Sequence, residues 1–341
     1  MERVAQWMEG DRRDLFEETS TRKGMSPAIV EKDFWVCWTL RRLFASGELA
    51  SKIMFKGGTS LSKVFGLIER FSEDIDLILD WAEVTSEDPF EERSKTKQDK
   101  YNKQIVEGSR AYISDHMIPE IQSLLGDLCS ISGMEDEPDI IHVTYPASFS
   151  DDYLRPEVLL EVGPLAQWTP NNSFEIQPYA ADAFPEQFEE PRCRVQAVCA
   201  ERTFWEKATI LHHEAHRFVN KPVPLRVSRH YYDLARMAEQ DVRSAALANL
   251  DLLKSVVDFK LRFYPQKWAR YDLARPGTLK LVPPDYMLKE IRRDYTAMEA
   301  MIYGDVPSVD HILEVLKDLE GEINVLSLQP TEVDEKPVLP P

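Results

Sequence analysis

The sequence predicts an α/β amino-terminal part followed by a helical carboxyl-terminal part. In the first half, short apolar stretches that alternate with period two are interspersed with stretches of helical period. From Arg202 onward, apolar residues recur at helical spacing in successive segments that proline or glycine separates. The 341 residues are enough for two domains. We expect domains at 1–195 and 196–328, and a disordered tail at 329–341, which holds four prolines.

Each element is predicted from its periodicity and its end signals. The first helix, 27–45, starts with Ser26 as N-cap and Pro27 at its first position. Further along, the expected strands are 53–55, 75–79, 140–145 and 157–163. We expect a helix between the first two strands, with Leu61, Val64, Phe65 and Ile68 on one face, and another helix around 105–125. The charged segment 83–103 is expected to be an exposed excursion. In the second half, the expected helices are 202–217, 229–240, 242–263, 284–303 and 309–326.

The composition argues against two classes of protein. A net charge of −18 disfavours a protein that coats nucleic acid through a general basic field. It leaves room for a local basic strip of Arg217, Lys221, Arg226 and Arg229, although a solvated basic face explains these residues equally well. No apolar run approaches the ~18 residues of a membrane-spanning helix, and the charged start lacks the apolar core of a secretory signal.

The cysteines indicate the compartment. Cys37, Cys129, Cys193 and Cys199 form no CxxC pair and no regular framework. We therefore expect a cytoplasmic protein with reduced thiols and no membrane contact.

The stretch Phe55 to Leu79 combines two glycines with two closely spaced aspartates. Gly57 and Gly58 allow the backbone to turn tightly before a helix, and the N–H groups at Thr59 and Ser60 favour an anion such as phosphate. A glycine pair before a helix is more often only a turn, and the chain has no GxxxxGK[ST] loop.

The two aspartates point to a metal ion. Asp74 and Asp76 lie two positions apart on a strand, so their carboxylates project from one face, where like charges repel. Mg²⁺ between them and a substrate phosphate would remove that repulsion, whereas hydrated acids at a solvent-facing edge are the alternative. Ser72 shares this face on an extended chain.

A third carboxylate on an adjacent strand would complete a two-ion site. Glu161, a lone acid among aliphatic residues in VLLEVG, is the best candidate, and Glu157 is a weaker one. Burying such an acid without a partner costs several kcal/mol, which favours a metal or cationic neighbour over an acid at a strand end that faces water.

The ordered set of motifs resembles the AbiEii/AbiGii toxin family. GGTSLSKVFGLIERFSEDIDLIL is similar to motif I of these nucleotidyltransferase-fold proteins, which belong to the DNA-polymerase-β superfamily and act in abortive infection and toxin–antitoxin systems. VEKDFWVCWTL resembles the family's amino-terminal helix, LLEVG its third-carboxylate strand, and ERTFWEKATILHH and SRHYYDLARM its lysine-bearing and aspartate-bearing helices. The likeness spans residues ~26 to ~240 and leaves out the charged excursion after Leu79.

The resemblance implies a small mixed sheet and a set of site residues. Asp74, Asp76 and Glu161 would bind metal, Lys207 would meet the triphosphate, and Asp233 would be a late catalytic acid. The residues implied for phosphate binding are Gly57, Gly58, Thr59, Ser60 and Lys207, and we expect Lys56, Ser72 and Arg229 to contribute to nucleotide or phosphate binding as well.

The residues alone leave alternatives open for the second-half motifs. Lys207 points off the apolar face of its helix, toward a cleft or solvent, and Asp233 has Arg229 and Arg236 at spacings of a surface ion-pair ladder. The HHEAH segment from His212 to His216 is not a HExxH zinc motif, so we expect partly exposed histidines there.

The favoured activity is a Mg²⁺-dependent nucleotidyltransferase that transfers a nucleoside monophosphate from an NTP to the 3′ end of a tRNA. A cognate antitoxin is the partner that the resemblance implies. The alternatives are a nucleotide-binding regulator without turnover and a metal-dependent nuclease. The nuclease is disfavoured because a PD-(D/E)xK motif needs a lysine two positions after the acid, whereas Val162 and Gly163 follow Glu161.

Overall fold

The computed structural model describes residues 1–72, 74–150 and 154–326, so the predicted tail at 329–341 lies outside the described residues. The chain divides into two compact units. The first contains Met1–Thr203 and, from much later in the chain, Met298–Val306. The second contains Phe204–Ala297 and the described residues from Pro307 on.

A seven-stranded sheet forms the centre of the first unit, in the order β3-β4-β5-β2-β1-β7-β6. The pairs β2/β5 and β1/β7 are parallel and the other neighbours are antiparallel, which confirms the predicted mixed sheet. The strands are β1 (Ile53–Lys56), β2 (Asp74–Leu79), β3 (Ser130–Gly133), β4 (Ile140–Thr144), β5 (Glu157–Gly163), β6 (Asn171–Ile176) and β7 (Cys193–Val198).

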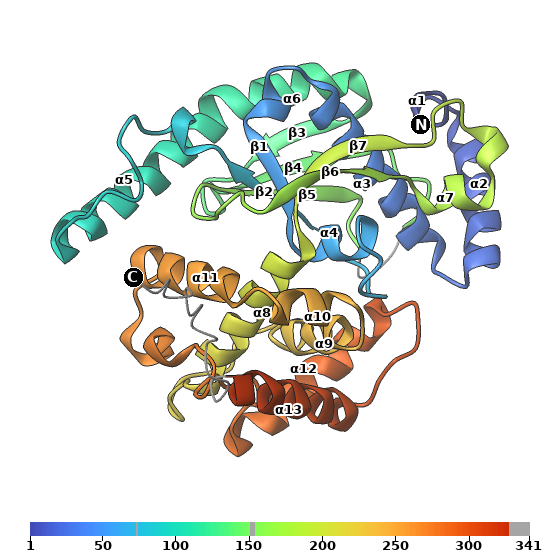
Figure 1. Ribbon diagram of the computed structural model, residues 1–341. Helices are drawn as coiled ribbons and strands as arrows, with labels where there is room; N and C mark the ends of the chain where they lie inside the picture. Colours follow the sequence, from blue (N-terminus) through green and yellow to red (C-terminus); the bar gives the residue numbers. More distant parts are fainter. Residues whose placement is uncertain (73, 151–153, 327–341) are drawn as a thin grey trace, which may run out of the picture. The chain divides into compact units, whose positions relative to one another are not determined.

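One face of the sheet is buried in the main core. Ile75 and Leu77 of β2 and Leu160 and Val162 of β5 lie in this core, because alternate residues of a strand point to the same side. The helix α3 (Pro27–Ala45) packs against the sheet from that side with Trp35 and other apolar residues (Figure 1). The other helices of this unit are α1 (Glu2–Ala5), α2 (Glu9–Lys23), α4 (Gly57–Lys63), α5 (Lys95–Tyr112), α6 (Ile118–Leu125) and α7 (Tyr179–Ala183).

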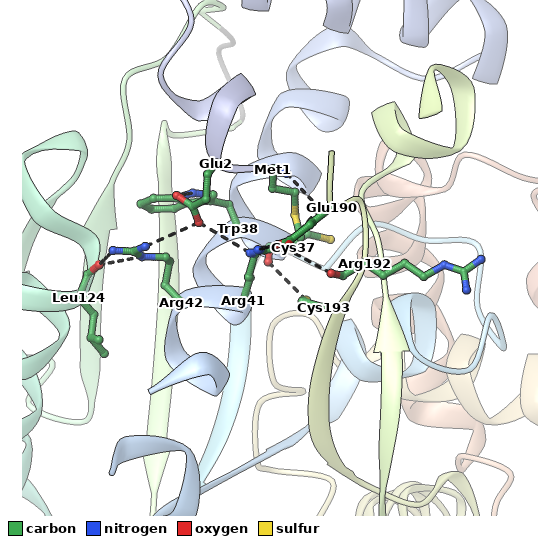
Figure 2. A network of polar contacts seen from close by, with 10 residues as sticks. All are labelled: Met1, Glu2, Cys37, Trp38, Arg41, Arg42, Leu124, Glu190, Arg192 and Cys193. Carbon is green, nitrogen blue, oxygen red and sulfur yellow. Dashed lines mark hydrogen bonds and ion pairs between the residues drawn. The ribbon is translucent and has the colours of Figure 1, made fainter. Parts of the chain in front are cut away.

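A polar network holds the start of the chain against α3 (Figure 2). Glu2 accepts a hydrogen bond from the Trp38 indole at 3.2 Å, and its carboxylate lies 3.8 Å from Arg41 and 3.7 Å from Arg42. Arg41 also pairs with the Glu190 carboxylate. These contacts tie α1, α3 and the segment before β7 together, so residues that are distant in the sequence share one edge of the fold.

In the first unit, two predicted helices differ from the observed ones. The helix expected around 105–125 begins at Lys95, inside the charged excursion, and runs through a π-helical turn at Ile113–Met117 into α6. The helix after β1 starts at Gly57 itself and ends at Lys63, so the stripe expected to reach Ile68 is wrong. Gly66, with a φ of 62°, and the Ser60 carbonyl, which accepts from Val64 and Phe65, turn the chain out of the helix.

The second unit is built from helices. They are most of α8 (Ala200–Ala215), then α9 (Ser228–Ala238), α10 (Val242–Leu247), α11 (Leu250–Phe263), α12 (Asp285–Met298) and α13 (Val309–Val325). The single helix predicted at 242–263 is two helices, because the Asn249 side chain accepts from the Leu252 N–H and caps a new amino terminus. Within the described ranges, no helix is long and apolar enough to cross a membrane.

Candidate active site

Three strands bring a row of charged residues together on the sheet face opposite the main core. In the strand register, Asp76 of β2 lies opposite Lys56 of β1 on one side and Glu161 of β5 on the other. Residues in register on neighbouring strands point to the same face and stand about 5 Å apart. Asp74 shares this face, two residues earlier on β2. A cation and three carboxylates from separate parts of the sequence therefore meet on one surface.

The register also separates the two glutamates of β5. Glu157 lies opposite Thr144 of β4, and its carboxylate is 3.1 Å from Nδ1 of His142. The part of β5 that pairs with β2 begins at Leu159, and Glu157 lies before it. Glu161, and not Glu157, is the acid beside Asp76.

The two glycines of α4 make room for side chains of the site. Gly57 has a φ of 82°, and a Cβ there would stand 1.8 Å from Oδ2 of Asp76. A Cβ on Gly58 would stand 2.9 Å from the Ser72 hydroxyl and 3.0 Å from Nη2 of Arg70. The sequence suggested that these glycines allow a ligand to approach. In the structure their neighbours are the aspartate, serine and arginine themselves.

The hydroxyl groups of α4 are used within the protein. Thr59 donates to the backbone carbonyl of Asp74, and Ser60 donates to the carbonyl of Gly57 at 2.9 Å. Both residues are buried. These bonds hold the start of α4 against the start of β2, so the groups of this turn that suit a phosphate are backbone N–H groups rather than hydroxyls.

Arg70 is a site residue that sequence reasoning missed. Its side chain is buried, and Nη1 donates to the Phe71 carbonyl at 3.2 Å, while Nη2 lies against Gly58. Arg70, Ser72, Asp74 and Asp76 follow one another at period two. Continuing the alternation of the strand two steps back would have identified this guanidinium.

A buried ion pair supports α4 from the side of α3. Nζ of Lys63 lies 2.7 Å from Oδ1 of Asp33 and 3.8 Å from the centre of the Tyr179 ring. Asp33 also accepts the Tyr179 N–H at 2.7 Å. Burial alone would lower the pKa of Lys63, but the adjacent Asp33 carboxylate outweighs it and raises that pKa. The pair is therefore charged, and it joins α4, α3 and α7.

Glu31 has a similar structural role two residues earlier. Its carboxylate accepts the backbone N–H groups of Ser148 and Phe149 at 2.7 and 3.2 Å. The acids of the VEKDFWVCWTL segment thus hold α4 and a loop in place. They affect the charged row only indirectly, through the position of these elements.

In the second unit, Lys207 of α8 and Asp233 of α9 form a buried ion pair. Nζ of Lys207 is 2.6 Å from Oδ2 of Asp233, and the two side chains are 8% and 0% exposed. His230 adds Nδ1 at 3.4 Å from the same ammonium. The surface ladder considered for Asp233 is wrong, because Asp233 is buried and Arg236 pairs with Glu239 at 3.2 Å. Arg229 lies one turn before Asp233 and is half-buried.

Comparison with known proteins identifies the family. The family model of the nucleotidyl transferase AbiEii toxin, from type IV toxin–antitoxin systems, matches residues 38–315. The chain belongs to the AbiEii family. Its members are nucleotidyltransferase toxins, and the family implies an antitoxin partner and an NTP substrate.

The structure of MenT4, a nucleotidyltransferase toxin from Mycobacterium tuberculosis, is similar at 15% sequence identity with a TM-score of 0.44, over 92% of this chain and 98% of that chain. None of the curated proteins compared with the chain matches it.

The AbiEii family match contains both sets of charged residues but not the acids that support α4. Asp74, Asp76, Glu161, Lys207 and Asp233 all lie within 38–315. Glu31 and Asp33 lie before the matched region, whereas their partners Lys63, Ser148, Phe149 and Tyr179 lie within it.

The donor set of this AbiEii chain suits a hard cation. Asp74 and Asp76 present carboxylate oxygens on one face, and Mg²⁺ is usually bound by one or two carboxylates with substrate phosphates and water. Among the residues that the structure describes, no three or more His, Cys, Asp or Glu side chains are grouped to hold a metal ion. An open site that substrate oxygens complete fits these residues.

Of the three histidines in the HHEAH segment, His213 and His216 are partly exposed as expected, but His212 is fully buried. Its Nδ1 accepts the Lys280 N–H at 3.0 Å, and its Nε2 lies 2.9 Å from the Arg270 carbonyl. Burial lowers the pKa of His212 to about 4, so the ring is neutral at pH 7. Arg217 is held by Glu214 at 2.5 and 2.8 Å, which removes it from the basic strip considered for this segment.

Proposed function

We propose that this AbiEii toxin transfers a nucleoside monophosphate from an NTP to the 3′ end of a tRNA, with Mg²⁺ bound by Asp74 and Asp76. The observation that carries the proposal is the row of Lys56, Asp76 and Glu161 on three neighbouring strands, with Asp74 on the same face. Three acids on one surface repel one another, and cations shared with a triphosphate relieve that repulsion.

The transfer is an in-line substitution at phosphorus. The acceptor hydroxyl oxygen bonds to the α-phosphorus of the NTP, the bond to the β-phosphate bridging oxygen breaks, and pyrophosphate leaves with the charge. Mg²⁺ held by Asp74 and Asp76 would supply positive charge for the activation of the hydroxyl and for the neutralisation of the pyrophosphate. Glu161 is the third carboxylate of this set and accepts the hydroxyl proton.

The cationic residues have roles in binding the nucleotide. Lys56, on the charged row, and the backbone of Gly57 and Gly58 contact phosphate. Further candidates are the backbone N–H groups of Thr59 and Ser60, and the side chains of Ser72 and Arg229. The buried Arg70 adds a second positive charge next to Gly58. Lys207 contacts the triphosphate, and Asp233 keeps the ammonium charged and oriented and is the late catalytic acid.

A transfer assay tests the proposal. The purified protein is incubated with Mg²⁺, total tRNA and each of the four labelled NTPs in turn. We expect label at the tRNA 3′ end with at least one NTP, none after chelation of Mg²⁺, and a loss on the order of 1,000-fold for Asp76→Asn. Asp139→Asn is the control variant. It removes the charge of an acid that forms a half-exposed ion pair with Arg110, and it should leave the rate unchanged.

The two glutamates of β5 provide a second contrast. Glu161→Gln should lower the rate on the order of 100-fold, whereas Glu157→Gln should have little effect because its carboxylate pairs with His142 instead. Equal labelling by Asp76→Asn and the parent protein would refute the proposal. RNA shortening without any NTP would indicate a nuclease, and NTP binding without transfer to RNA would indicate a nucleotide-binding regulator.

We further propose a cytoplasmic location and a cognate antitoxin encoded beside this gene.

A further inference from the structure

A pocket of about 520 Å³ lies in the first unit, at the edge of the sheet where β2 and β5 end. Two segments line it: the residues that follow β2, from Asp80 to Phe90, and Ala166 to Thr169, which follow β5. We call it the aromatic pocket, because Trp81, Phe90 and Trp168 are among its lining residues. Its volume is that of a site for a small molecule or for one unit of a polymer.

The aromatic pocket is continuous with the face that carries the acids. Trp168 and Ala166 pack on a small apolar cluster of Met54, Ile78 and Val198. Ile78 lies two residues after Asp76 on the same face of β2, which is a distance of about 7 Å along the strand. A nucleotide whose phosphate lies at Asp76 can therefore reach Trp168 with its base.

The side chains of the pocket present flat apolar surfaces. The rings of Trp81 and Phe90 lie 5.4 Å apart at an angle of 31°, and the Trp81 indole donates to the Pro164 carbonyl, which fixes that ring. Phe90 is 47% exposed. Its contact with Trp81 holds Phe90 in place, and the exposed part of its ring is open to a flat ligand.

Acidic side chains accompany the rings. Asp80, Glu87 and Asp88 all line the pocket. Their charge repels phosphate, so the phosphates of a ligand must stay toward the charged row and its cations. Carboxylates accept hydrogen bonds from the amino groups of cytosine, adenine and guanine, whereas uracil has no amino group.

We propose that the aromatic pocket binds an unpaired nucleobase by stacking, with a preference for bases that carry an amino group. This inference rests on the proposed function, because it takes the ligand to be a nucleotide whose phosphate lies at the charged row. The base belongs either to the incoming NTP or to the end of the acceptor RNA, since both present the same chemistry. The rings supply affinity and the acids supply selectivity.

Phe90→Ala is the main test, because a half-exposed side chain can be removed without opening the core. The measurements are the Kd of each NTP by calorimetry with Mg²⁺ and the KM for tRNA in the transfer assay. Loss of one stacking ring should weaken one of them on the order of tenfold. Met134→Ala, which removes a side chain of similar exposure (45%) outside the pocket, should change neither.

The two measurements distinguish the source of the base. A higher Kd for NTPs assigns the pocket to the incoming nucleotide, and a higher KM for tRNA with unchanged NTP binding assigns it to the acceptor. Asp88→Asn keeps the acceptor for the Phe90 N–H, which lies 2.8 Å from Oδ1, and removes only the charge. It should reduce the preference for CTP, ATP and GTP over UTP, or for acceptor ends with amino-bearing bases over a uridine end.

Two outcomes overturn the inference, and one further outcome overturns the proposed function on which it rests. If Phe90→Ala leaves NTP binding and the KM for tRNA within twofold of the parent while Asp76→Asn abolishes transfer, the pocket is not a base site and the proposed function stands. If Asp76→Asn transfers normally, the proposed function fails, and the NTP affinities of Phe90→Ala alone then decide the pocket. Binding of spermidine or an arginine-rich peptide that Asp88→Asn abolishes, with unchanged NTP and RNA affinities, would assign the pocket to a cation.

Discussion

Gly57 and Asp76 are in such close contact that a Cβ on Gly57 would stand 1.8 Å from Oδ2 of Asp76. The glycine has a φ of 82° at the start of α4, and the aspartate is at the centre of the charged row on β2. The first turn of α4 therefore sets how closely this carboxylate can approach the helix. The glycine pair and the aspartate pair of the motif are one packed unit rather than two neighbouring sites.

The first prediction is that Gly57→Ala nearly abolishes transfer while the protein remains folded. The new methyl group must displace the Asp76 carboxylate, and a misplacement of about 1 Å in an active site can cost on the order of 100-fold in rate. The positive φ adds about 1–2 kcal/mol of strain. Transfer rates and thermal unfolding of the variant measure the two effects separately.

Gly24→Ala is the matched control for that variant. Gly24 has a φ of 68° at the end of α2, and a Cβ there has no neighbour within 4 Å. This substitution carries the same backbone strain without the collision, so it should lower stability by a similar amount and leave the rate unchanged. Equal rates for the two variants would show that the Gly57–Asp76 contact has no part in catalysis.

The second prediction concerns the Asp33–Lys63 pair under α4. Asp33→Asn leaves the Lys63 ammonium buried without its anion, which should cost about 3–5 kcal/mol of unfolding free energy. Adding Lys63→Met should restore much of that loss, because the double variant buries no unpaired charge. Denaturant unfolding of both variants measures this coupling.

A partly exposed ion pair provides the comparison. Lys23 lies 3.1 Å from Asp182, with side chains 31% and 34% exposed. Lys23→Met should cost no more than about 1 kcal/mol, since solvent screens such a pair. If Asp33→Asn were as mild as Lys23→Met, the buried pair would not be what anchors α4 to α3.

Local pattern was enough to predict the strands that carry the acids. DIDLIL and EVLLEVG alternate clearly, and β5 has the predicted limits, Glu157–Gly163. The helix α3 also has its predicted limits, since Pro27 can only occupy a first turn, although the Ser26 side chain makes no capping bond. In each case the signal lies within a few residues of the element.

Contacts between distant parts of the chain could not be predicted from local sequence pattern. Asp76 and Glu161 are in register through a parallel pairing that depends on the whole sheet. The domain boundary expected between residues 195 and 196 falls inside β7, which pairs with β1. The burial of Asp233 depends on Lys207 on another helix, and helical spacing reports only the neighbours on the same helix.

The third prediction concerns stability against pH. The pKa of His212 is about 4 in the folded protein because of burial, whereas an unfolded histidine has a pKa near 6.5. The unfolded state thus binds the extra proton, and the stability that neutral His212 contributes is lost as the pH falls below about 6.5. Between pH 7 and 5 this single group should reduce the unfolding free energy by about 2 kcal/mol.

Denaturant unfolding at both pH values measures this loss. His212→Gln removes the titrating group, so the variant should be less stable at pH 7 and lose about 2 kcal/mol less than the parent between pH 7 and 5. A parental slope in His212→Gln would assign the acid sensitivity to other groups.

The last prediction separates catalysis from folding at Lys207 and Asp233. Lys207→Met leaves the fully buried Asp233 carboxylate without its cation, so it should lower the unfolding free energy by about 3–5 kcal/mol as well as the transfer rate. The loss of activity alone would therefore be ambiguous.

Combining Lys207→Met with Asp233→Leu replaces the pair by apolar groups and should recover most of the stability. If the ammonium contacts the triphosphate, the stabilised double variant should still transfer on the order of 100-fold more slowly than the parent, with a higher KM for the NTP. Recovery of the parental rate together with stability would show that the pair serves only to hold α8 against α9.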